Sequence, residues 1–77
     1  MTKLPIVSGR EAIRAFERLG YQVVRRRGSH VRLRHPTEPR RKPLTIPDHK
    51  TIKPGLLRHL IADAGITVEE FVKLLKR

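Results

Sequence analysis

Apolar residues in the first part of the chain repeat at the spacing of one helix face. The repeat consists of Ala12, Ile13, Phe16 and Leu19. Ser8 precedes it and Glu11 follows three residues later, which is the form of a capping box, in which two side chains satisfy free amides at a helix start. Gly20 is the residue type that most often ends a helix. The pattern therefore predicts a helix over residues 9–19.

Two further apolar stripes with helical spacing lie in the last third of the chain. They are formed by Leu57, Leu60, Ile61 and Ala64, and by Val68, Phe71, Val72 and Leu75. Pro54 suits the first turn of the earlier helix and Gly65 suits its end. Thr67 and Glu70 make a second capping box in front of the later stripe. We therefore expect two helices that are separated at Gly65.

Between these helical segments the sequence is typical of short strands. The predicted strands cover residues 21–27, 30–35 and 44–46. A two-residue turn at Gly28 and Ser29 joins the first two, and Pro47 stops the third. The order α-β-β-β-α-α predicts one α+β domain over residues 1–77, with a three-stranded antiparallel sheet and helices on one face.

The length of the turn fixes which side chains share a face of the sheet. A two-residue turn places Arg27 opposite His30, Arg25 opposite Arg32, and Val23 opposite Arg34. The core side would carry Val24, Val31 and Leu33. The open side would carry His30 among Arg25, Arg27, Arg32 and Arg34. Because like charges across a sheet repel, this cluster indicates an anionic ligand, with a merely solvated face as the alternative.

The charge balance points to the same class of partner. Eighteen Lys and Arg stand against seven Asp and Glu, a net charge of +11. Such an excess opposes compaction, and a polyanion or an acidic protein would offset it. Both phenylalanines fall on predicted core stripes, which leaves Tyr21 as the only free aromatic. We therefore expect nucleic acid, most of all RNA, to be bound through shape and phosphate rather than by base stacking.

The segment between the third strand and the next helix is a second candidate contact. Residues 48–54 lead into a helix N-terminus, where free amides and the helix dipole favour a phosphate. Lys50 and Lys53 would add positive charge there. An ordinary connecting loop explains this segment equally well.

The residue content excludes several other chemistries. The chain has no cysteine, so disulfides and thiolate metal sites are excluded. His30 and His35 are five residues apart on one predicted strand, which sends them to opposite faces, and we expect no metal site or cofactor. No apolar run has the length of a membrane span, so we expect a cytoplasmic protein that does not act at a membrane.

His30 is the residue on which a catalytic reading depends. RNA can be cleaved when its 2′-hydroxyl is deprotonated and attacks the adjacent phosphate, which requires a proton acceptor and positive charge but no metal. Ser29 lies next to His30 and diverges from it, so the two do not form a nucleophile–base pair. From residue chemistry alone, a histidine that only contacts RNA is the favoured interpretation. His59, off the apolar stripe, is expected to be exposed.

Short motifs along most of the chain resemble the HicA toxins of toxin–antitoxin modules. They are Gly28-Ser29-His30, His35-Pro36, Ile46-Pro47-Asp48-His49-Lys50, Lys53-Pro54-Gly55-Leu56-Leu57-Arg58, Ala64-Gly65-Ile66 and Glu70-Phe71. The resemblance implies a fold similar to a double-stranded RNA-binding domain. It also implies a metal-independent endoribonuclease that cuts mRNA and is neutralised by an acidic HicB-like antitoxin.

The resemblance also assigns roles to residues. Through the Gly-Ser-His motif it makes His30 the catalytic histidine, and through the Pro-x-His-Lys motif it adds His49 and Lys50 to the site. The predicted RNA contacts are Arg25, Arg27, Ser29, Arg32, Arg34, His49, Lys50 and Lys53. The family pattern Gly-Thr-Leu is replaced here at Leu56, so a hydroxyl contact at that helix start is lost.

Three other functions remain compatible with the sequence. The first is a double-stranded RNA-binding module without catalysis. The second is a DNA-binding partner in a repressor complex. The third is an interaction module whose basic face serves only an acidic protein. Salt sensitivity separates the last from the other two, because phosphate binding weakens steeply with salt.

Overall fold

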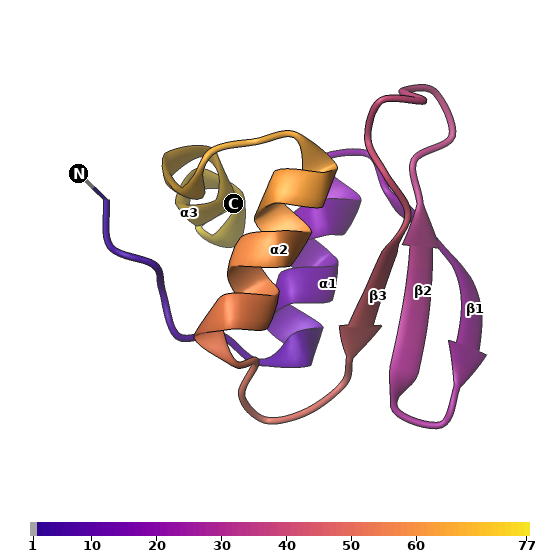
Figure 1. Ribbon diagram of the computed structural model, residues 1–77, viewed down its shortest axis with the longest axis horizontal. Helices are drawn as coiled ribbons and strands as arrows, with labels where there is room; N and C mark the ends of the chain where they lie inside the picture. Colours follow the sequence, from indigo (N-terminus) through magenta and orange to yellow (C-terminus); the bar gives the residue numbers. More distant parts are fainter. Residues whose placement is uncertain (1) are drawn as a thin grey trace.

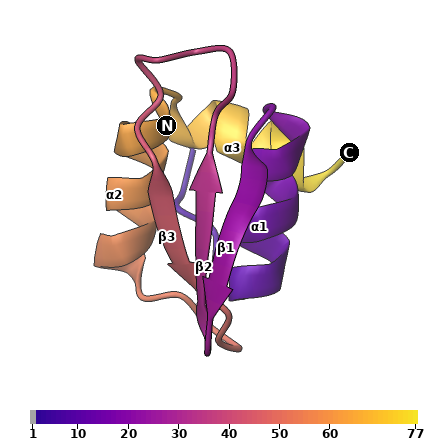
Figure 2. The same cartoon turned by 90° about the vertical axis from the view of Figure 1, so that its right-hand side faces the viewer.

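The computed structural model describes residues 2–77 as a three-stranded sheet with three helices on one side (Figure 1). In chain order the elements are α1 (Gly9–Arg18), β1 (Gln22–Arg27), β2 (His30–Arg34), β3 (Leu44–Pro47), α2 (Pro54–Ala64) and α3 (Val68–Leu75). The sheet is antiparallel with the order β1-β2-β3. Figure 2 looks onto the sheet, with the helices behind it. The predicted α+β class and element order are confirmed, and element ends differ from prediction by about one residue.

Both predicted capping boxes are present. At α1 the Ser8 hydroxyl accepts the Glu11 amide at 3.0 Å, and the Glu11 carboxylate accepts the Ser8 amide at 2.8 Å. Thr67 and Glu70 repeat this exchange at α3 with distances of 2.9 and 3.1 Å. The hydrogen bond from the Thr67 backbone lowers the pKa of Glu70. The stabilisation from this cap is therefore present above the ordinary glutamate pKa and is lost as pH falls through the lowered value.

The core lies between the sheet and the helices and is built from the predicted stripes. Its largest fully buried side chains are Phe16, Phe71, Leu33, Leu44, Ile46, Leu57 and Val31. The Phe16 and Phe71 ring centroids are 5.2 Å apart, so α1 and α3 meet through their aromatic rings. In α3 the second buried residue is Leu74, whereas Val72 and Leu75 of the predicted stripe are only half-buried.

The prediction that Tyr21 is a free aromatic is wrong. Its side chain is 2% exposed and packs edge-on against Phe16, with 5.9 Å between ring centroids. The hydroxyl donates to the Lys42 carbonyl at 2.8 Å, and burial raises the pKa of Tyr21. With Phe16, Phe71 and Tyr21 buried, no Phe, Tyr or Trp ring lies on the sheet surface for base stacking.

His35 connects the end of β2 to the end of α1. It is half-buried on the side opposite His30, as the spacing predicts. Its Nε2 lies 3.0 Å from the Leu19 carbonyl, which can only accept, so Nε2 carries the hydrogen. Nδ1 then accepts the Glu38 amide at 3.1 Å. His35 therefore holds the loop after β2 in place.

Replacing Gly20 with alanine is expected to lower the free energy of unfolding by about 1–3 kcal/mol. Gly20 has φ of 113°, and a Cβ there would lie 2.6 Å from Nε2 of His35. The matched control is Gly55→Ala, because a Cβ at Gly55 in α2 meets open space. That change should be neutral or stabilising by up to about 1 kcal/mol. Urea unfolding of both variants measures the difference, and equal effects would contradict the expectation.

Candidate nucleic-acid interface

The hairpin of β1 and β2 has the predicted turn. Arg27 pairs with His30 and Arg25 with Arg32, as a two-residue turn requires. Gly28 has φ of 59° and no other residue type has positive φ in residues 2–77, which fits a type II′ turn with glycine first. The register near the turn is therefore confirmed.

The register farther from the turn differs from prediction. A bulge between Val23 and Arg25 adds one residue to β1, so Arg34 pairs with Gln22 rather than with Val23. Val24, predicted to face the core, is 52% exposed. The whole of β1 is exposed because it forms the outer edge of the sheet (Figure 2). The core prediction holds for Val31 and Leu33, which are fully buried.

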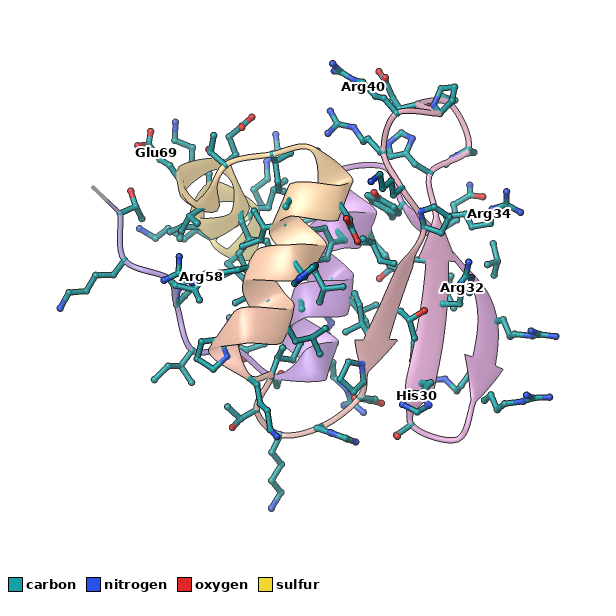
Figure 3. All side chains as sticks on the ribbon, viewed as in Figure 1. His30, Arg32, Arg34, Arg40, Arg58 and Glu69 are labelled. Atoms are coloured by element: carbon teal, nitrogen blue, oxygen red, sulfur yellow. The ribbon has the colours of Figure 1, made fainter. Side chains whose placement is uncertain are left out.

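The open side of the sheet carries the predicted basic cluster, which we call the arginine face. It comprises Arg25, Arg27, Arg32 and Arg34, and all four are exposed. His30, also exposed, lies between Arg27 on β1 and Pro47 on β3. Figure 3 shows His30 near the hairpin end of β2, with Arg32 and then Arg34 farther along the same strand. The structure thus brings the histidine and the arginines onto one surface.

The rest of that surface is uncharged. By register its other members on the strands are Gln22, Thr45 and Pro47. Arg32 donates to the Thr45 hydroxyl at 3.3 Å, which orients one guanidinium without neutralising it. The summed positive potential on this face is therefore available to an anion from solution.

The segment after β3 lies at the same end of the molecule as the hairpin turn and the start of α1 (Figure 1). The Asp48 amide donates to the Ser29 carbonyl at 2.6 Å, and the Gly9 amide donates to the His49 carbonyl at 2.8 Å. Ser29 and His49 are exposed, and so are Lys50 and Lys53, which precede α2. The predicted second contact segment is thus held next to the hairpin turn rather than at a distance from it.

The sequence interpretation missed Arg26. By register it pairs with Val31 and so belongs to the helix side of β1, and its guanidinium lies 3.2 Å from the Asp48 carboxylate. Strand alternation within Arg25-Arg26-Arg27 was a signal that the middle arginine turns away from its neighbours. This contact directs the Asp48 carboxylate toward Arg26, away from the arginine face.

An apolar groove lies elsewhere on the molecule. Leu4, Pro5 and Ile6 of the N-terminal segment line it together with Ile52, Pro54 and Arg58 at the start of α2. None of the predicted contact residues lines it. Figure 3 shows Arg58 on α2, away from the sheet that carries His30. The candidate site is therefore an open basic surface, a shape that suits a polymer better than a small molecule.

The described residues place limits on metal and membrane sites. In residues 2–77 no three His, Cys, Asp or Glu side chains are grouped closely enough to hold a metal ion. Over the same residues no helix has the length and apolar character needed to cross a bilayer.

Comparison with known proteins gives one result. The family model described as the HicA toxin of bacterial toxin–antitoxin matches residues 9–66 of the 77-residue chain. A search of curated proteins gave no match. The matched region runs from the start of α1 to just past α2, so it contains every residue of the candidate site.

Proposed function

Because this chain belongs to the HicA family of bacterial toxin–antitoxin toxins, we propose that it is an endoribonuclease that cleaves mRNA without a metal ion. The observation that carries the proposal is the position of His30. Its ring is exposed on an open surface and is flanked by arginines of two strands. A proton acceptor among fixed cations is the combination that 2′-hydroxyl attack on a phosphodiester requires.

In this reaction His30 acts as the general base. It removes the proton of a ribose 2′-hydroxyl, and the 2′-oxygen then attacks the neighbouring phosphorus. Negative charge builds on the phosphate oxygens, and the positive potential of the arginine face stabilises it. Ser29, His49, Lys50 and Lys53 contact the RNA backbone beside the cleaved bond.

The partner of this toxin would be an acidic antitoxin of the HicB type. Membership of a toxin–antitoxin family implies an antitoxin. An acidic surface placed over the arginine face would remove the charge repulsion among the arginines and block access to His30. The proposed substrate, mRNA, places both proteins in the cytoplasm.

Incubation of the purified protein with a long mRNA in excess EDTA tests the proposed activity. Cleavage that persists in EDTA is expected, since no step uses a metal. RNA that is bound but left intact would instead favour a non-catalytic RNA-binding module. Competition with duplex DNA at fixed salt identifies the DNA-binding alternative, because in that case DNA would displace the RNA.

Arg25→Ala is expected to weaken RNA binding and to reduce the slope of log affinity against log salt by about 1. Each arginine bound to phosphate releases counterions, so removal of one contact removes its share of the salt dependence. Arg58→Ala removes the same charge from α2, away from the sheet (Figure 3), and should leave the slope unchanged. The affinity of each variant for RNA is measured at salt concentrations from about 50 to about 300 mM, and the two slopes are compared. Equal slopes for both variants would argue against the arginine face as the binding surface.

A further inference from the structure

The cleavage described above leaves one proton transfer without an assigned group. When the bond from phosphorus to the 5′-oxygen breaks, the departing oxygen carries negative charge and needs a proton. His30 cannot supply that proton in the same step in which it accepts one from the 2′-hydroxyl. A second group beside His30 is therefore required for efficient cleavage.

The backbone of His49 lies close to that of His30. His30 is paired with Pro47, and the Asp48–Ser29 hydrogen bond of 2.6 Å continues the contact of the two chains one residue beyond that pair. His49 follows at the next position. His49 lies beyond the end of β3, and the Asp48–Ser29 hydrogen bond keeps it beside the hairpin turn that leads into His30. Both side chains are exposed at this end of the sheet, where one bound RNA strand can reach them.

The position of His49 is also fixed from the side of α1. Its carbonyl accepts the Gly9 amide at 2.8 Å. Gly9 is buried against this segment, and a Cβ there would overlap the Pro47 carbonyl, so only glycine allows α1 to start so close to it. The contact between Asp48 and Arg26 holds the preceding residue as well. The backbone is thus held at several points while the His49 side chain remains exposed to solvent.

We propose that His49 is the general acid of the cleavage reaction, an inference that rests on the proposed ribonuclease function. The 2′-oxygen gives its proton to neutral His30 and forms a bond to phosphorus. The bond from phosphorus to the 5′-oxygen breaks, and the imidazolium of His49 gives its proton to that oxygen. The products are a 2′,3′-cyclic phosphate and a 5′-hydroxyl. Exchange with water then returns His30 to its neutral form and His49 to its protonated form.

Lys50 is the neighbouring alternative, and it is less suited to this role. A lysine ammonium holds its proton much more tightly near neutral pH than an imidazolium does. General acid catalysis is most efficient when the pKa of the acid lies near the pH at which the enzyme works. The charge of Lys50 serves better to hold the RNA backbone.

A substrate whose leaving group needs no proton tests the assignment. The cleavage site is first mapped on mRNA, and two short RNAs are made that differ only in the scissile 5′ atom, oxygen in one and sulfur in the other. On the oxygen RNA, His49→Ala should cleave about 10²–10⁴-fold more slowly than wild type. On the sulfur RNA it should cleave within about tenfold of wild type, because thiolate leaves unprotonated. His30→Ala should be slow on both, and His59→Ala, a histidine exposed on α2, should match wild type on both.

Each outcome decides between roles for His49. Equal losses on the oxygen and sulfur RNAs would mean that His49 binds or positions the RNA, and no loss on either would mean that it takes no part. Both results overturn the assignment, whereas selective recovery on sulfur supports it. If wild-type protein cleaves neither the mRNA nor the short RNAs, the ribonuclease function itself fails, and that failure is distinct from a loss limited to His49→Ala. Circular dichroism of each variant confirms that it is folded.

Discussion

His30→Ala is expected to slow mRNA cleavage by about 10²–10⁴-fold, the usual contribution of a proton-transfer group. The loss should fall on the chemical step, because the arginine face, the proposed RNA-binding surface, is unchanged. The ring is exposed at the surface, so its removal should not affect folding. Single-turnover cleavage in EDTA measures the rate, and binding of RNA under conditions where it is not cut measures the affinity.

His59→Ala is the matched control for this experiment. It removes an exposed imidazole from α2, outside the sheet, and should leave both cleavage and binding at the wild-type level. If His30→Ala cleaves as fast as wild type, then another residue is the base. If its rate falls only in proportion to a loss of RNA binding, then His30 is a contact residue, as its chemistry alone suggested.

The helical part of the fold could be predicted because its signals are local. Each capping box lies within four residues of sequence, and both form as expected. The stripe of α2 and most of that of α1 are buried as the spacing requires. Neither feature depends on how distant segments pack, so the sequence specifies them directly.

The sheet was less predictable because its register depends on the partner strand. The two-residue turn fixes the pairs as far as Arg25, and beyond it the bulge at Val24 shifts the pairing by one residue. Because Val23 and Val24 are adjacent, the alternation of apolar and polar residues does not show which of the two faces the core, and so it does not reveal the bulge. Tyr21 was misjudged for a similar reason, since its burial results from Phe16 on one side and the loop at Lys42 on the other.

The residues of the candidate site could be predicted where the alternation of side chains along a strand alone decides which of them face outward. Arg32 and Arg34 face outward because Val31 and Leu33, which alternate with them along β2, are buried. The position of His49 beside the hairpin turn was not predictable from spacing. It depends on two hydrogen bonds across long sequence separations, from the Asp48 amide to the Ser29 carbonyl and from the Gly9 amide to the His49 carbonyl. The proposal that His30 is catalytic rests on the family resemblance together with the exposure of its ring, and not on periodicity.

Leu33→Asp is expected to unfold the protein. Leu33 is fully buried on the central strand, between the sheet and the helices. A carboxylate placed there has no partner and costs on the order of 4 kcal/mol or more, even if it takes up a proton. A chain of this size has a total stability of about 4–12 kcal/mol, so the loss is comparable to the whole. Circular dichroism and thermal unfolding would show the absence of a cooperative transition.

Arg32→Ala, one residue away, is the control for this change. Arg32 is exposed and its side chain bonds to Thr45 at the surface, so its removal should alter stability by no more than about 0.5 kcal/mol while weakening RNA binding. The two variants separate the two faces of one strand, because adjacent residues of β2 point in opposite directions. The reverse result, with Leu33→Asp folded and Arg32→Ala unfolded, would place the arginines inside. In that case the sheet would offer no basic surface to RNA, and His30, which shares the face of these arginines, would be closed off from any substrate.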